Sequence, residues 1–271
     1  MFFVSTFWKN KKMQIIDRDF VNKKFNDYVA AYCEDGDTKV VLKVEHTYRV
    51  ADLSEQIAKS IGLQEEDVDL AWLIGMLHDI GRFEQIRRYG TFEDARSVKH
   101  ADLGVEILFE QHGINGYLCD SKENERKLKI IRDAIAYHSD YRLPDDLDDE
   151  TKCFCDILRD ADKIDIMKVV VEKDPVDIYG VTYEELKRQR FTDEVLRCFD
   201  EGHAVLRSLR KSRLDNLAGY ASFVYELVYP ESRRLMKEQG YIWELLAFQS
   251  EDEQVNRQLR EMESKLRKVL S

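Results

Sequence analysis

Six residues with metal-binding side chains lie on or beside the apolar faces of separate predicted helices. They are His46, His78, Asp79, His100, His138 and Asp162. An imidazole or a carboxylate that is buried without a partner costs several kcal/mol, so five helices that each carry such a group favour one shared partner. Neutral histidine and ionised aspartate are good ligands for divalent ions. The sequence therefore predicts a metal centre in the core.

A single histidine on an apolar stripe has a simpler explanation, as a core side chain hydrogen-bonded to a backbone carbonyl group. His46, His100 and His138, taken singly, would be explained in this way. All three accompany the adjacent pair His78 and Asp79, whose side chains diverge by about 100° at the end of a predicted helix. This pair can hold one metal ion from two sides, or the carboxylate can bridge two ions. Its presence favours the metal-binding interpretation.

Apolar residues at helical spacing predict the elements that position these side chains. The expected helices cover residues 13–33, 38–61, 66–80, 98–112, 123–138 and 151–172. We expect Gly81 to end the third helix, and a basic loop to follow over 82–99. From residue 176 the pattern is helical but weaker, and 242–270 is predicted to form an exposed helix that could pack on a partner.

The composition supports an all-α fold. The chain of 271 residues has 3 prolines and 12 glycines, and 35% of its residues are charged, so helix breakers are few. We expect an N-terminal helical segment at 1–37, a metal-binding core at 38–175, and a helical cap or tail packed on that core at 176–271.

Charge and cysteine content limit the function. A net charge of −11 argues against a general nucleic-acid surface, which is usually basic, and no apolar run is long enough to predict a transmembrane helix. Five cysteines without a CxxC pair favour reduced thiols and a cytoplasmic protein. An anionic substrate must therefore meet a local basic patch. Candidates for that patch are Arg82, Arg87, Arg88, Arg96 and Lys99.

Three segments carry a resemblance to a known family. LIGMLHDIGRFEQ, with His78 and Asp79, resembles the signature of the HD-domain superfamily of metal-dependent phosphohydrolases. VEHTYRVADLS matches the family's earlier histidine with His46. RDADKIDIM matches its distant aspartate with Asp162, and Asp160 is the alternative. The resemblance covers about residues 40–172 and implies an all-α HD-domain core, with an additional C-terminal helical region.

The resemblance also implies a site with one or two divalent ions. His100 and His138 resemble the extra ligands of two-metal members, such as dinucleoside-tetraphosphate hydrolases and cyclic-dinucleotide phosphodiesterases of the HD-GYP type. The chain lacks the GYP triplet and is longer than the compact tetraphosphate hydrolases. Our hypothesis is that Asp79 bridges two metals. The first would also bind His46, His78 and Asp162, and the second His100 and His138.

The implied activity is hydrolysis of a phosphoester or phosphoanhydride, in a nucleotide or a related small phosphate compound, by metal-activated water. Arg82 would grip phosphate through its guanidinium group. Lys163 would reach the substrate or pair with a nearby carboxylate. Iron, manganese, cobalt, zinc and nickel suit the ligand set about equally.

Two other functions stay open. A small HD branch uses the same ligands as a mixed-valent diiron oxygenase, and a non-catalytic nucleotide sensor would need no open metal position. We expect a small phosphorylated substrate, no nucleic-acid polymer and no membrane. A homodimer through the last helix is left open.

Overall fold

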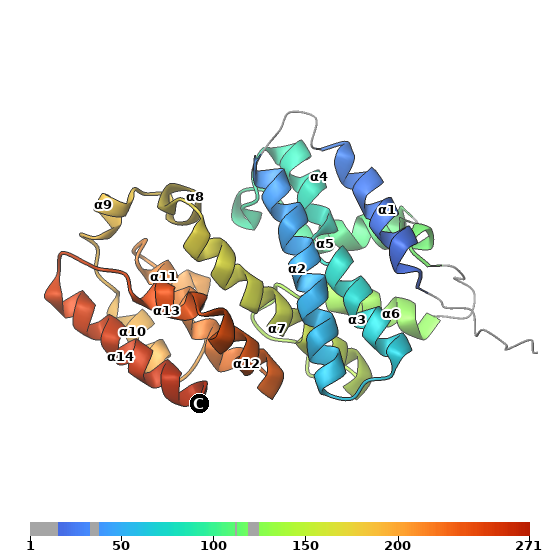
Figure 1. Ribbon diagram of the computed structural model, residues 1–271. Coiled ribbons are helices and arrows are strands. Elements are labelled where there is room, and N and C mark those ends of the chain that lie inside the picture. The colour runs from blue at the N-terminus through green and yellow to red at the C-terminus, as the bar shows by residue number, and fades with distance from the viewer. Residues whose placement is uncertain (1–15, 33–37, 112, 119–124) are drawn as a thin grey trace, which may run out of the picture.

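The computed structural model describes residues 16–32, 38–111, 113–118 and 125–271 (Figure 1). Every regular element in these ranges is a helix, which confirms the predicted all-α fold. None of the described helices combines the length and the apolar character that crossing a bilayer requires. His112, Cys33 and Cys119 fall outside the described residues, as do the ends of the helix predicted over 13–33.

Seven α-helices lie in the described part of the chain before residue 175, besides short 3₁₀ and π-helical segments. They are α1 (Arg18–Ala30), α2 (Thr38–Ser60), α3 (Glu65–Leu77), α4 (Ile80–Tyr89), α5 (His100–Val105), α6 (Glu125–Tyr137) and α7 (Asp149–Glu172). Seven further helices follow. They are α8 (Pro175–Tyr179), α9 (Tyr183–Leu186), α10 (Asp193–Asp200), α11 (Asp215–Ala221), α12 (Pro230–Gln239), α13 (Tyr241–Leu246) and α14 (Glu253–Val269).

Helix α7 lies between the helices that precede it and those that follow it (Figure 1). The side chain of Asp148 caps its first turn by accepting a hydrogen bond from the Thr151 amide, and acidic residues in that turn suit the positive end of the helix dipole. Helices α2, α3 and α6 pack on α7, and so do α12 and α13 from the group that follows it. A residue on α7 can therefore face either half of the molecule. The division at residue 175 stays a prediction.

The predicted loop over 82–99 is wrong in its first half, because residues up to Tyr89 form α4. Gly81 lies inside this helix and does not end one. A Cβ at Gly81 would overlap the carbonyl oxygen of His100 and lie 2.6 Å from the Gly104 nitrogen, so glycine permits the close crossing of α4 and α5. The break between α3 and α4 falls two residues earlier, at Asp79, whose φ of −102° and ψ of 15° are not helical.

Two other predicted helices differ from the structure. The segment 98–112 forms the short α5, which continues as a π-helix over Glu106–Glu110. The long exposed helix predicted over 242–270 is two helices, α13 and α14. Helix α14 buries Val255, Leu259, Met262 and Leu266 at helical spacing, and it packs on α13 and on the 3₁₀ helix Ser222–Glu226. This apolar face is therefore covered by the chain itself.

Candidate metal centre

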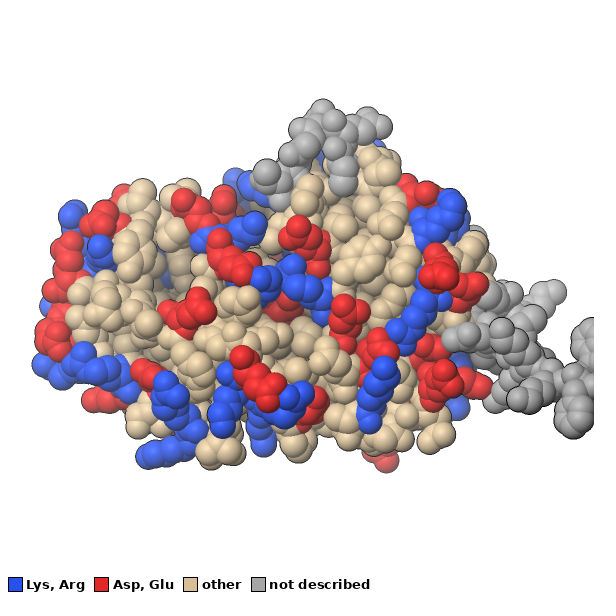
Figure 2. All heavy atoms as spheres, viewed as in Figure 1, with Lys and Arg blue, Asp and Glu red and all other residues tan. Residues whose placement is uncertain are grey.

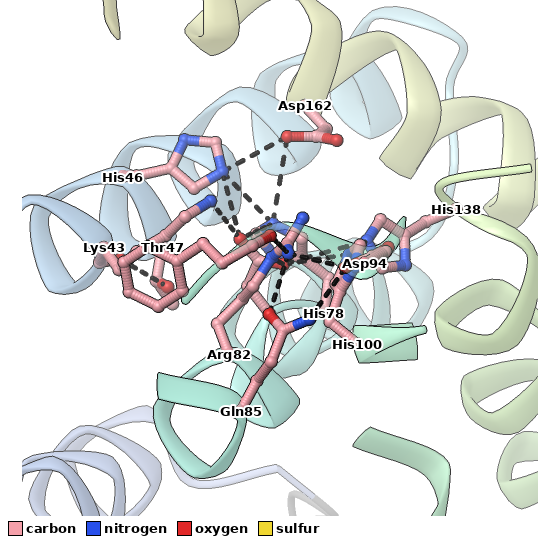
Figure 3. A network of polar contacts seen from close by, with 12 residues as sticks. Lys43, His46, Thr47, His78, Arg82, Gln85, Asp94, His100, His138 and Asp162 are labelled. Carbon is pink, nitrogen blue, oxygen red and sulfur yellow. Dashed lines mark hydrogen bonds and ion pairs between the residues drawn. The ribbon is translucent and has the colours of Figure 1, made fainter. Parts of the chain in front are cut away.

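The six predicted ligand residues lie together in the interior. Figure 3 labels the four histidines and Asp162. His46 comes from α2, His78 and Asp79 from the junction of α3 and α4, and His100 from the first turn of α5. His138 follows the last residue of α6, and Asp162 lies midway along α7. The site thus depends on the packing of six helices, α2 to α7, around one point.

The ligand atoms form two groups of three. One group contains His46, His78 and Asp162, and the other contains Asp79, His100 and His138; within each group the atoms lie within 4.8 Å of one another. Asp79 faces both groups. Its Oδ2 lies 3.6 Å from Nε2 of both His46 and His78, whereas its Oδ1 lies 3.4 Å from Nε2 of His100 and 3.8 Å from Nε2 of His138.

The second nitrogen of each imidazole faces a hydrogen-bond acceptor. His78 Nδ1 lies 2.7 Å from the Gly75 carbonyl oxygen, and His138 Nδ1 lies 2.7 Å from that of Ile135. For His100 and His46 the acceptors are carboxylates, described below. Because a carbonyl or carboxylate oxygen only accepts, each Nδ1 carries the proton and donates it. In the neutral ring, Nε2 then has a free lone pair directed at the cluster.

These lone pairs test whether the site fits a metal. His100 Nε2 lies 2.9 Å from His138 Nε2, and His46 Nε2 lies 3.3 Å from His78 Nε2. Two unprotonated nitrogens cannot hydrogen-bond to each other, so each contact brings two acceptors together in a buried place. A cation between them satisfies both. The donor set of four imidazoles and two carboxylates suits divalent transition metals, and the residues therefore fit such ions.

The charge states agree with this fit. Burial lowers the pKa of His78 and His100, and lowers that of His138 to about 3. Burial opposes ionisation of Asp79, but the charges of Lys43 and neighbouring groups outweigh it and hold its pKa well below the usual range. Three histidines are thus neutral and Asp79 is ionised, as metal binding requires.

His46 differs from the other three histidines. Burial and Lys43 lower the pKa of His46, but hydrogen bonds to Asp162 and Asp165 outweigh them and raise it overall. A positive charge is therefore favoured between His46 and Asp162, where Nε2 and Oδ1 are 3.2 Å apart. A proton or a metal ion can supply that charge.

Three supporting residues were not predicted. Asp165 Oδ2 accepts a hydrogen bond from His46 Nδ1 at 2.6 Å, and Asp94 Oδ2 accepts one from His100 Nδ1 at 2.7 Å. Lys43 Nζ donates to Asp79 Oδ2 at 2.6 Å. Helical spacing could have suggested Lys43, which precedes His46 by three residues, and Asp165, which follows Asp162 by three. Asp94 lies in an irregular stretch, and no local pattern indicates it.

The two carboxylates of the RDAD segment have different surroundings. Asp162 faces the imidazoles, whereas the buried carboxylate of Asp160 accepts hydrogen bonds from the amides of Val228 at 2.9 Å and Tyr229 at 3.1 Å. Burial raises the pKa of Asp160 to about 6. Asp160 therefore ties α7 to the C-terminal helices and lies outside the cluster. His203, in the C-terminal part, is exposed.

The cluster opens on a cavity of about 370 Å³. Both predicted substrate-binding cations line it. Arg82 Nη1 donates to Asp94 Oδ1 at 2.8 Å and to Gln85 Oε1 at 2.9 Å, while its buried Nε has no hydrogen-bond partner. Lys163 Nζ lies 3.0 Å from Glu226 Oε2, so this lysine pairs with a carboxylate from the C-terminal part and still borders the cavity.

The other predicted basic residues do not line the cavity. Arg87 and Arg88 both bind the carboxylate of Glu84, which does not line the cavity either. Arg96 Nη1 lies 3.4 Å from Glu93 Oε1, and Lys99 Nζ lies 2.7 Å from Asp140 Oδ1. Nearby carboxylates thus balance these charges.

Fold and site together define a helical protein whose buried histidines and aspartates could hold metal ions. Residues 44–167 match the family model of the HD domain, and this range contains all six candidate ligands. This part of the sequence is therefore an HD domain, as the resemblance indicated. HD domains are generally metal-dependent hydrolases. No curated protein and no solved structure gives a significant match to the chain.

Proposed function

We propose that this protein is a phosphohydrolase that cleaves a phosphoester or phosphoanhydride bond in a nucleotide or a related small phosphate compound. One observation carries the proposal. Two groups of ligand atoms, between which the carboxylate of Asp79 lies, open on a cavity lined by cationic side chains. A site built for two metals and an anion suits hydrolysis of phosphate compounds.

His46, His78 and Asp162 would hold one ion, and His100 and His138 a second, with one oxygen of Asp79 facing each group. Bound divalent ions supply Lewis acidity, which activates water and neutralises charge on phosphate oxygens. Asp94 and Asp165 orient the imidazoles of His100 and His46 through Nδ1, which keeps each Nε2 free to bind.

The chain's own cations act on the substrate. Asp94 and Gln85 fix the Arg82 guanidinium at the cavity wall beside Asp79, and its Nε, which has no hydrogen-bond partner, lies 3.5 Å from Asp79 Oδ1. A guanidinium that is already held in place can donate to a phosphate oxygen without losing further conformational freedom when the substrate binds. Glu226 holds Lys163 at the same cavity. Both side chains would offset negative charge as it develops on the phosphate.

The size of the cavity favours a small substrate. A volume of about 370 Å³ falls in the range of pockets that enclose one small organic molecule. Acidic and basic side chains are interspersed on the face shown in Figure 2, without a broad basic surface there. This face offers no track for a nucleic-acid polymer.

Metal analysis of protein purified without added metal, joined to a phosphate-release screen, tests the proposal. We expect a divalent transition metal in the purified protein. We also expect phosphate release from at least one nucleotide or dinucleotide, lost with a chelator and restored by metal. An iron-loaded protein that consumes oxygen and releases no phosphate would contradict the proposal and favour the oxygenase. Metal-free protein that binds nucleotides without turnover would favour a sensor.

A further inference from the structure

The C-terminal part of the chain forms one wall of the cavity. The stretch 204–210 contributes to this wall together with Tyr220, Phe223 and Glu226, and all of them follow the HD match, which ends at residue 167. Candidate metal ligands line the same cavity. The histidine–aspartate cluster and side chains from outside the HD domain thus line the same cavity.

The cations of this cavity differ in their partners. Those that come before the C-terminal part are neutralised or satisfied: Lys43 pairs with Asp79, Arg82 with Asp94, and Lys163 with Glu226, while Arg159 donates to backbone carbonyls of 137–141. By contrast, Arg207 and Arg210 form no ion pair with any carboxylate in the part of the chain that the structure describes. Two positive charges in the cavity are therefore not neutralised by a direct ion pair.

Arg210 is held in place although it lacks an acidic partner. Its Nη2 donates to the Val205 carbonyl oxygen at 2.9 Å, and its Nε is buried without a hydrogen-bond partner. The guanidinium lies directly against the backbone of Gly219, where a Cβ would overlap it. A buried donor without an acceptor is unfavourable, and an anion bound in the cavity would remove that cost.

Aromatic rings border the same region. Tyr220 and Phe223 pack edge to face with ring centroids 6.0 Å apart, and the Arg210 guanidinium lies 5.9 Å from the Tyr220 ring centroid. An organic group next to the bound anion would meet these rings. The wall thus combines positive charge with an apolar surface.

We propose that Arg207 and Arg210 form a second anion-binding subsite, and that the substrate is a small organic molecule with two anionic groups. One is the phosphate that reacts at the metal cluster, and the other binds to the two arginines, while Tyr220 and Phe223 contact the organic part. This inference rests on the proposed function for the first group only.

Two matched compounds test the subsite. Adenosine 5′-monophosphate and adenosine 3′,5′-bisphosphate differ by one phosphate, and their dissociation constants for the metal-loaded protein can be measured by calorimetry at low temperature. We expect the dissociation constant of the bisphosphate to be at least about tenfold lower, because one charge-assisted hydrogen bond changes affinity by about this factor. Arg207→Ala and Arg210→Gln should remove this preference and leave the affinity for the monophosphate within about threefold.

The controls separate the subsite from folding. Arg197→Ala removes an exposed arginine of the same region that does not line the cavity, and it should keep the preference. Arg207 is also exposed, so its replacement should leave thermal unfolding unchanged even if Arg210→Gln proves unstable. Equal loss of affinity for both compounds in Arg207→Ala would overturn the subsite.

Phosphate release, assayed on the same samples, separates the two proposals. A preference for the bisphosphate that depends on Arg207, without phosphate release from any compound, would keep the subsite and contradict the hydrolase. Phosphate release with equal affinity for the two compounds would support the hydrolase and overturn the subsite.

Discussion

The carboxylate of Asp165 lies 2.6 Å from Nδ1 of His46, and the same carboxylate accepts a hydrogen bond from Arg49 Nε at 2.6 Å. Asp165 therefore decides which nitrogen of His46 carries the proton and which faces the cluster. Through this contact a residue outside the candidate ligand set orients one of its members.

Replacing Asp165 should weaken metal binding without abolishing it. In Asp165→Asn the amide no longer stabilises the Nδ1 proton of His46 as a carboxylate does, and we expect metal affinity to fall about 10- to 100-fold. Titration of the chelator-treated protein with metal measures this change. Asp156→Asn, on the same helix but paired with Lys152, is the control. Equal affinities in the wild type and Asp165→Asn would contradict the orienting role.

Replacing Asp79 should have a larger effect. Because its two oxygens face different ligand groups, Asp79→Ala is expected to lose both metals and all turnover. Metal content by mass spectrometry and phosphate release check this expectation. Asp102→Ala, an exposed aspartate of α5, should retain both. Full metal content in Asp79→Ala would show that Asp79 does not bridge.

Arg82 and Arg87 offer a matched pair on one helix. Arg82 lines the cavity, whereas Arg87 is paired with Glu84 away from it. We expect Arg82→Ala to raise KM and lower kcat/KM about tenfold or more, since one charge-assisted hydrogen bond is lost, with metal content intact. Arg87→Ala should leave both constants unchanged. Equal kinetic constants in the two variants would show that Arg82 does not bind the substrate.

The crossing of α4 and α5 provides a test through two glycines. A Cβ at Gly81 would overlap the His100 carbonyl oxygen, whereas a Cβ at Gly104 would lie 3.4 Å from Ile135 Cγ2, an ordinary contact. We expect Gly81→Ala to lower the free energy of unfolding by about 1–3 kcal/mol and to weaken metal binding by displacing His100. Gly104→Ala should be tolerated. The reverse order of stabilities in denaturant titrations would contradict this packing.

Because the carboxyl group of Asp160 is buried, we expect the free energy of unfolding to depend on pH. Burial raises the pKa of this carboxyl group to about 6, above the value in the unfolded chain. The folded state therefore favours the protonated form, so this contribution to stability is fully present below about pH 4 and is lost as pH rises through 6. Across that window, wild type should lose up to about 3 kcal/mol relative to Asp160→Asn.

Denaturant titrations of both proteins at several pH values, with the metal concentration held constant, measure this difference. Other titrating groups are common to both proteins, so their effects cancel. A difference that is flat or grows with pH would mean that the amide hydrogen bonds from Val228 and Tyr229 outweigh burial.

The sequence by itself determined the helices and the kinds of side chain in the centre. Helical periodicity is a local property, so most of the first seven helices could be predicted, and an apolar stripe interrupted by His46 or His138 shows that a polar group enters the core. The order of histidines and aspartates along the chain also sufficed to identify the family. None of this requires knowing which helices touch.

Only the tertiary structure decided which partners complete the site. The sequence predicts a helix end at Gly81, but the need for glycine there arises from α5, a separate helix that crosses α4 at this point. Asp94 supports the site through its hydrogen bond with His100, and it lies in an irregular stretch of the chain. Asp160 lies outside the site because it binds the amides of Val228 and Tyr229, which are distant in sequence. Arg207 and Arg210 line the cavity only because the C-terminal helices pack against α7. Such contacts between remote segments leave no periodic trace in the chain, since they depend on how the helices pack.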